Sequence, residues 1–377
     1  MTNKNIKLAV YLVFLMVYLL PSGLIFGPFS AIHNHIFAVI LAALYLLPTL
    51  KSGKMNKKTF CIWIGVFFIA CYTRKFGFID MIIIPIVDEF IKNKEKVKKI
   101  VLNSSIVYIS IIFTIIYSLI YSNLGLGGRG EGSIGSGLLF TAIGEINLTG
   151  LSVFCLALLT RKKNKWLGNI LIFLGMLTVS RSYLLALMCL LFFNINFVKK
   201  IINKLLKWLT YMNLTLLSSI AFICLGIILI DVFLNGGINE HSVTAGFSRL
   251  FSLNDFSNYF RFLAIYLVAK ILINHPQKII LGISDDEYIN YGHEICSAKG
   301  IQFTGIGPHN VFFSHLKIYG IAVLFEIYYV SKYLKKIITV DNFGIFFAIF
   351  CYCIILGTGF TNYWLFLSVI TLIMYEK

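Results

Sequence analysis

Apolar runs that are long enough to cross a bilayer follow one another along almost the whole chain, and short clusters of lysine and arginine separate them. A transmembrane helix needs about 20 apolar residues, so the 377 residues have room for roughly a dozen such helices. Hydrophobic residues make up 58% of the chain and charged residues only 13%, whereas water-soluble domains contain about 25% charged residues. We therefore expect an all-α, polytopic integral membrane protein, and the composition argues against a soluble enzyme or a disordered chain.

The basic clusters account for the formal net charge of +17 without a nucleic-acid partner. Lysine and arginine gather in this way in the cytoplasmic loops of membrane proteins. The clusters lie at 51–58, 92–99, 161–165, 199–207 and 332–336. With these loops on the cytoplasmic side, both chain termini are expected to be cytoplasmic as well.

Two apolar segments each connect two of these clusters, so each must cross the membrane twice. They are 59–91, whose polar break lies at 73–75, and 166–198, whose only polar break lies at 180–182. A single helix of either length would be about 50 Å long and would place its two basic ends on opposite faces. We therefore predict a helical hairpin in each segment.

With both hairpins counted, the chain is predicted to contain about 12 transmembrane helices. Nine of them are expected in residues 1–234 and three in 311–377, with one large extracytoplasmic loop, 235–310, between them. An apolar stretch of that loop, 258–274, is expected to form an amphipathic helix in the outer membrane interface. The acidic run at 285–287 is either a solvated surface or a ligand set for a divalent cation.

A second outer loop, 122–137, contains seven glycines around Arg129 and Glu131. No strand is expected before it and no GxGxxG pattern is present, so the loop does not indicate nucleotide binding. We interpret it as a flexible connector in which Arg129 is a candidate contact for an anion.

Several polar side chains lie in apolar surroundings. Arg181 has apolar helix on both sides, where an ionised guanidinium is costly unless it is paired. It either extends to the outer headgroups or binds an anionic group such as a phosphate. His309 directly precedes an expected helix, and its imidazole can accept a proton near neutral pH. Farther along, His315 is expected to pack or to form a hydrogen bond, and Glu326 to pair with a basic group such as Lys317 or to line a polar cavity.

Three stretches, in order along the chain, are similar to motifs of the bacterial O-antigen polymerase and O-antigen ligase family. LTVSRSYLLAL, which contains Arg181, resembles the Ser-Arg motif in a transmembrane turn of that family. NYFRFLAIYLVAKILINHPQKIILG resembles its arginine-led helix that ends in a proline and a hydrophobic-Gly motif, here with Arg261 and Pro276. GPHNVFFSHLKIYGI resembles its His-Asn motif, which opens a helix with a later glycine, here Gly320. The resemblance covers residues 170–335.

The resemblance implies an inverting, metal-independent glycosyltransferase that needs no cofactor and acts at the outer face of a bacterial inner membrane. As a polymerase, it would transfer a glycan from undecaprenyl diphosphate onto an incoming lipid-linked repeat unit of a surface polysaccharide. The alternatives are a ligase that transfers the polymer to lipid A-core, and a flippase or other transporter of lipid-linked oligosaccharide. The lipid bilayer surrounds the protein in each case, and a chain-length regulator in the membrane is a candidate partner.

The resemblance also implies roles for individual residues. His309 is expected to be the general base that deprotonates the acceptor hydroxyl, and the alternative is a histidine that only binds substrate. Arg181 and Arg261 are expected to bind the donor diphosphate, and Arg249 is a further candidate for this role. Asn310 is expected to orient either the imidazole or a sugar hydroxyl.

Overall fold

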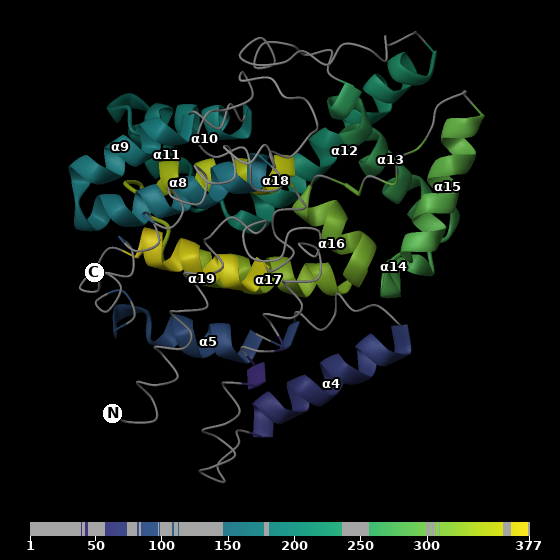
Figure 1. Cartoon of the computed structure of the whole chain (residues 1–377), viewed down its shortest axis with the longest axis horizontal. Helices are drawn as coiled ribbons and strands as arrows, with labels where there is room; N and C mark the ends of the chain where they lie inside the picture. Colours follow the sequence, from purple (N-terminus) through teal and green to yellow (C-terminus); the bar gives the residue numbers. More distant parts are fainter. Residues whose placement is uncertain are drawn as a thin grey trace. The chain divides into compact units, whose positions relative to one another are not determined.

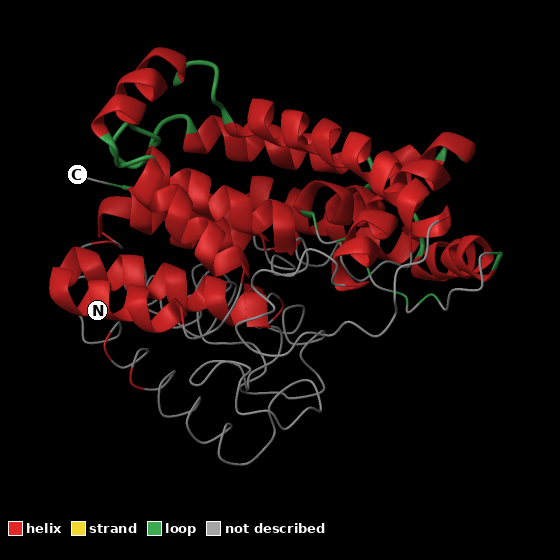
Figure 2. Ribbon diagram, turned by 90° about the horizontal axis from the view of Figure 1, so that it is seen from above, coloured by secondary structure: helices red, strands yellow, loops and turns green. Residues whose placement is uncertain are grey.

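In the part of the chain that it describes, the computed structural model consists of helices joined by loops and turns, as Figure 2 shows. No described residue belongs to a β-strand, which confirms the predicted all-α class. The described residues are 39, 42–43, 57–73, 81–82, 84–96, 98, 108, 112, 146–176, 181–235, 256–298, 303, 305, 307–308, 310–356 and 363–375.

No single helix in these residues is both long enough and apolar enough to cross a membrane. One pair of helices, Ser182–Phe192 followed by Asn196–Leu205, meets the requirement when the two are taken together, and they meet at an angle of 89°. The count of about 12 transmembrane helices therefore stays a prediction.

The chain divides into two compact units: unit 1 is Met1–Leu187 with Thr361–Lys377, and unit 2 is Met188–Phe360. The helices of unit 1 are α4 (Lys57–Thr73), α5 (Ile84–Lys92), α8 (Ile146–Lys163), α9 (Lys165–Gly175), the first part of α10 (Arg181–Phe192) and α19 (Tyr363–Met374). The helices of unit 2 are the rest of α10, α11 (Asn196–Leu205), α12 (Tyr211–Asn235), α13 (Phe256–Asn274), α14 (Lys278–Leu281), α15 (Asp285–Ser297), α16 (Val311–Tyr319), α17 (Ala322–Leu334) and α18 (Phe343–Leu356).

Both predicted hairpin breaks are present as helix boundaries in unit 1. The helix α4 ends at Thr73, while α9 ends at Gly175 and α10 begins at Arg181. The hydroxyl of Tyr183 on α10 donates a hydrogen bond to the carbonyl oxygen of Ile172 on α9 at 2.7 Å. This contact across the break ties α10 back to α9, as a hairpin requires.

The helix α13 lies within the hydrophobic core of unit 2 and packs against α12, α15 and α16 (Figure 1). Its buried residues are Leu263, Ala264, Ile265, Leu267, Val268, Ile271 and Leu272. The less buried face carries Phe262, Tyr266 and Ile273. The partly exposed residues of α13 also include Arg261 and Lys270. The helix predicted at 258–274 is therefore confirmed, and its amphipathic character stays a prediction. Its placement at the membrane interface stays a prediction.

Candidate functional site

Two of the predicted site residues, Arg261 and Asn310, lie on helices of unit 2 that pack against each other, α13 and α16. Arg261 is partly buried and comes two residues before Leu263, while Asn310 comes three residues before Phe313. Leu263 and Phe313 belong to one hydrophobic cluster, together with residues of α15. The arginine-led helix and the helix of the His-Asn motif therefore share one core.

The C-terminal ends of the same two motifs are in backbone contact at two glycines, Gly282 and Gly320. Gly282, which follows α14, has φ +78°, and Gly320, which follows α16, has φ +58°. A Cβ on Gly320 would lie 2.5 Å from the carbonyl oxygen of Ile280, and a Cβ on Gly282 would collide with the carbonyl oxygen of Lys317. The Ile283 N–H donates to that same Lys317 oxygen at 2.7 Å. Both positions need glycine, because the backbone conformation is left-handed and no space remains for a side chain.

The segment before α16 is held against α15 by Phe303. The Phe303 ring centroid lies 5.9 Å from that of Tyr288 and 5.8 Å from that of His293. The ring also lies on Gly292, where a Cβ would overlap it. Phe303 therefore anchors to α15 the segment that leads through the buried Pro308 to α16.

Asn310 is the N-cap of α16. Its side-chain Oδ1 accepts a hydrogen bond from the Phe313 N–H at 3.2 Å, and the residue is only 1% exposed. Its Nδ2 is buried and has no hydrogen-bond partner among the described residues. A buried donor without a partner costs about 1–3 kcal/mol. Since the oxygen caps the helix, only this amide nitrogen remains to orient an imidazole or a sugar hydroxyl.

The other predicted site residues are placed only in part. Arg181 begins α10 in unit 1, and its side chain lies outside the described part of the chain. His309, Arg249 and Arg129 also lie outside the described residues. The residues on both sides of His309, Pro308 and Asn310, are described and buried.

A buried polar pair connects α16 to α17. His315 Nδ1 lies 2.7 Å from Glu326 Oε2, and both side chains are buried. The predicted hydrogen bond of His315 is confirmed, but Lys317 is the wrong partner for Glu326. Lys317 is two residues from His315 and so points about 200° away on the helix, where its Nζ lies 2.6 Å from Asp285.

Glu326→Ala is expected to lower the free energy of unfolding by about 3–5 kcal/mol, because it leaves the His315 imidazole buried without its carboxylate. The double substitution to leucine at both positions should be much less costly, since neither member of the pair is then left buried without the other. Thermal unfolding of the purified protein measures both. The control is Lys278→Ala, which breaks an exposed ion pair and should change stability by less than about 1 kcal/mol. A double variant as unstable as Glu326→Ala would contradict the pairing argument.

The acidic run at 285–287 forms the first turn of α15, and Ser284 is the N-cap. The Ser284 hydroxyl accepts from the Glu287 N–H and the Glu287 carboxylate accepts from the Ser284 N–H, both at 3.3 Å, which is a capping box. Lys278 lies 2.6 Å from Glu287, and this hydrogen bond, helped by Ser284, lowers the pKa of that carboxyl below its ordinary value. Glu287 therefore stays ionised at a lower pH than a free glutamate.

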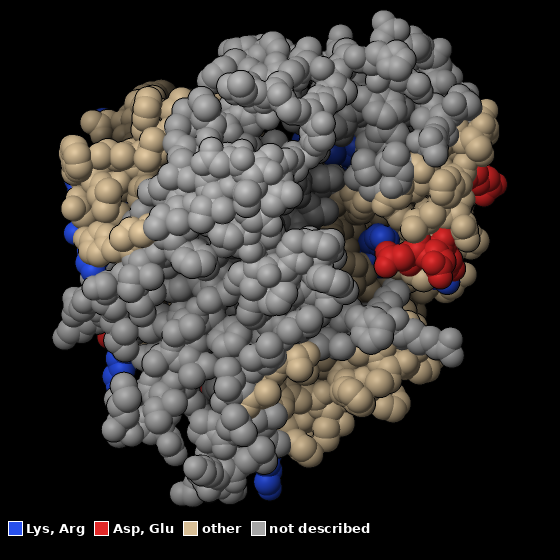
Figure 3. All heavy atoms as spheres, in the orientation of Figure 1, with Lys and Arg blue, Asp and Glu red and all other residues tan. Residues whose placement is uncertain are grey.

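The acidic side chains and their lysine partners form a patch over α14 and the start of α15 (Figure 3). No group of three His, Cys, Asp or Glu residues in the described part of the chain is placed to hold a metal ion. The sequence contained the signal for this arrangement, because Ser-x-x-Glu before a helix is the pattern of a capping box.

No protein-family model, curated protein or solved structure matches this chain. The likeness to the O-antigen polymerase and ligase family thus stays a resemblance between short motifs. What the structure adds is the geometry of two of those motifs, which lie in one unit and meet at Gly282 and Gly320.

Proposed function

We propose that the protein is an integral membrane glycosyltransferase that polymerises undecaprenyl-diphosphate-linked oligosaccharides into a surface polysaccharide. The backbone contact between Gly282 and Gly320 supports this proposal most directly. It makes the arginine-led motif and the His-Asn motif parts of one rigid arrangement, although they are far apart in sequence. Such rigidity is what an active site needs, since reacting groups must be held in a defined geometry.

Exposed apolar side chains support a location in a membrane. On α17, one exposed stripe has helical spacing and consists of Ile321, Leu324, Phe325 and Tyr328. On α4, another consists of Phe60, Ile64, Phe67 and Phe68. Water-soluble monomers rarely expose contiguous apolar surface on this scale, and lipid is the solvent that accommodates it. We therefore keep the predicted architecture of about 12 transmembrane helices with cytoplasmic termini as part of the proposal.

In the proposed reaction, His309 takes the proton of the acceptor hydroxyl as that oxygen attacks the anomeric carbon of the donor. The bond from this carbon to the diphosphate oxygen breaks, and the diphosphate leaves with the electron pair. Arg181 and Arg261, with Arg249 as a further candidate, would stabilise the leaving charge, because guanidinium groups donate paired hydrogen bonds to phosphate oxygens. The buried Asn310 amide nitrogen is available to orient a sugar hydroxyl or the imidazole.

Deletion of the gene, with the surface glycans separated on gels, tests the class of activity. Loss of the polymer ladder, with a single repeat unit still attached to the lipid core, is the expected result. Polymer that accumulates on its lipid carrier would indicate a ligase instead. Repeat units trapped on the cytoplasmic leaflet would indicate a flippase and overturn the proposal.

Arg261→Lys and Arg181→Lys are each expected to reduce polymer formation by about 100-fold or more, as loss of a group that stabilises a leaving charge does. Lysine keeps the charge but cannot reproduce the two parallel hydrogen bonds of a guanidinium. Arg161→Lys, in a predicted cytoplasmic cluster, is the matched control and should leave polymer unchanged. Normal polymer in both test variants, at normal protein levels, would show that neither arginine acts on the diphosphate.

A further inference from the structure

The helix α11 carries more apolar surface than the rest of the protein covers. Val198 and Ile202 are buried. Next to them, a second apolar stripe at four-residue spacing stays uncovered: Phe197 is 71% exposed, Ile201 41% and Leu205 46%. Exposed apolar residues with helical spacing form a continuous surface, and such a surface is typical of a site that contacts lipid or another protein.

The opposite side of α11 is basic. Lys200 and Lys204 lie about 200° and 240° around the helix from Val198, and Lys207 follows directly after the helix. Residues 196–208 contain no acidic side chain. A short helix with an apolar face and a lysine-rich face is typical of segments that lie in a membrane interface.

The orientation of α11 agrees with such a position. The helix α10 and the helix α11 meet at 89°. With ten residues, α11 is too short to cross the membrane by itself, and in the proposed architecture it belongs to a cytoplasmic loop. The exposed Trp208 follows α11, and tryptophan is enriched at the level of the lipid headgroups.

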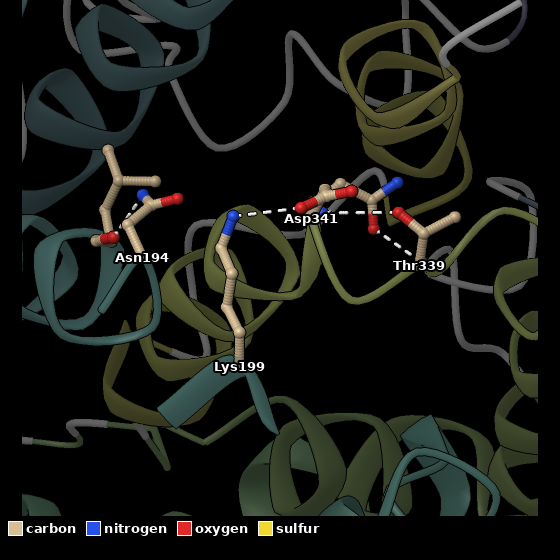
Figure 4. A network of polar contacts seen from close by, with 6 residues as sticks. Asn194, Lys199, Thr339 and Asp341 are labelled. Carbon is tan, nitrogen blue, oxygen red and sulfur yellow. Dashed lines mark hydrogen bonds and ion pairs between the residues drawn. The ribbon is translucent and has the colours of Figure 1, made fainter. Parts of the chain in front are cut away.

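Contacts within unit 2 hold α11 in place. Lys199 Nζ lies 2.9 Å from Asp341 Oδ1, in the turn before α18 (Figure 4). In the same turn, the buried Asn342 accepts from the Thr339 N–H at 2.8 Å. At the other end, Asn194 Nδ2 donates to the Leu190 carbonyl oxygen at 2.7 Å, where α10 ends. The Lys199–Asp341 ion pair therefore connects α11 to the turn before α18.

We propose that α11 lies in the cytoplasmic membrane interface and binds the headgroups of anionic phospholipids. Lys200, Lys204 and Lys207 contact the phosphates, and the stripe of Phe197, Ile201 and Leu205 lies among the acyl chains. The charge is complementary, because the cytoplasmic leaflet is anionic and attracts lysines that lie close to its surface. The inference rests on the membrane location in the proposed function, but not on glycosyl transfer.

Photo-crosslinking of the full chain in lipid nanodiscs tests which face of α11 meets lipid. Ile201→p-benzoylphenylalanine should form phospholipid adducts, and the same substitution at Asn203, on the polar side, should form none. Phe325, which is 75% exposed on α17, is the control position for contact with lipid. Adducts at Phe325 but not at Ile201, or adducts at Ile201 to another protein, would overturn the proposal while leaving the membrane location intact. No adducts at either position would overturn both.

The lysines are tested by titrating the full chain with phosphatidylglycerol and with phosphatidylcholine. Lys200→Gln, Lys204→Gln and Lys207→Gln together should weaken phosphatidylglycerol binding about tenfold or more, because each lysine near an anionic surface contributes to binding. The matched triple substitution to arginine should keep the binding within about twofold, since the charge is preserved. Unchanged binding in the glutamine variant would overturn the role of the lysines. If the protein proved not to transfer glycans, the expected lipid binding would be unchanged. The two proposals can therefore be refuted independently.

Discussion

His309→Gln is expected to slow glycosyl transfer by about 10²–10⁴-fold while the variant still binds the lipid-linked donor. The acceptor hydroxyl is a poor nucleophile, and removal of its proton during attack contributes a factor of this size. Glutamine keeps hydrogen-bonding groups but cannot accept a proton in the working pH range. Single-turnover transfer and donor binding, measured separately on purified protein with lipid-linked repeat units, check the two halves of this expectation.

The pH dependence adds a second test of the same role. Transfer by the unsubstituted protein should fall as the pH drops through the imidazole pKa, which is about 6.5 for an ordinary histidine. A protonated ring has no lone pair with which to accept the hydroxyl proton. The residual transfer of His309→Gln should lack this dependence, whereas a histidine that only binds substrate would leave the pH profile in place.

His275→Gln is the matched control, because His275 is exposed at the end of α13 and should not affect transfer. The unfolding temperature of His309→Gln should also be unchanged, which separates a chemical effect from a disturbed approach to α16. Near-normal turnover in His309→Gln would remove this residue as the base. Loss of donor binding would make it a binding residue instead.

Gly282→Ala and Gly320→Ala are each expected to lower the free energy of unfolding by about 3 kcal/mol or more. Alanine at a positive φ is strained, and its Cβ would collide with backbone atoms of the facing segment. Those atoms are carbonyl and amide groups, which cannot move aside as a flexible side chain can. Thermal unfolding of the full chain measures the loss, and polymer formation should fall with it because the two motifs separate.

Two other glycines of the same region distinguish the effect of backbone strain from the effect of a Cβ collision. Gly305 has φ +71° but its Cβ would meet nothing closer than 3.9 Å, so Gly305→Ala tests backbone strain alone, at about 1 kcal/mol. Gly307 has open space around it and no positive φ, so Gly307→Ala should be nearly neutral. If Gly282→Ala were as mild as Gly307→Ala, the close contact between the two motifs would be refuted.

The sequence by itself determined those features that depend on neighbours a few residues away. A helix end lies at each polar break predicted from the apolar runs: α4 ends at Thr73, in the break at 73–75, and α10 begins at Arg181, in the break at 180–182. The helix expected directly after His309 is present as α16, which begins at Val311. Asn310 is its N-cap, a role that was not predicted for this residue. The same kind of signal was present in Ser284 and Glu287, although the acidic run there was interpreted as a solvated surface or a cation site.

Only the tertiary structure decided which distant residues meet. Glu326 had basic candidates at several helical positions, and the packing of α17 on α16 selected His315 and left Lys317 to Asp285. The partnership of Gly282 with Gly320 likewise depends on two backbones approaching each other, which no periodicity of side chains encodes. An apolar run in the sequence indicates a helix that avoids water. It does not show which face of that helix packs on protein and which face contacts lipid. The uncovered stripe of α11 was therefore defined only by the structure, in which Val198 and Ile202 are buried while Phe197, Ile201 and Leu205 are exposed.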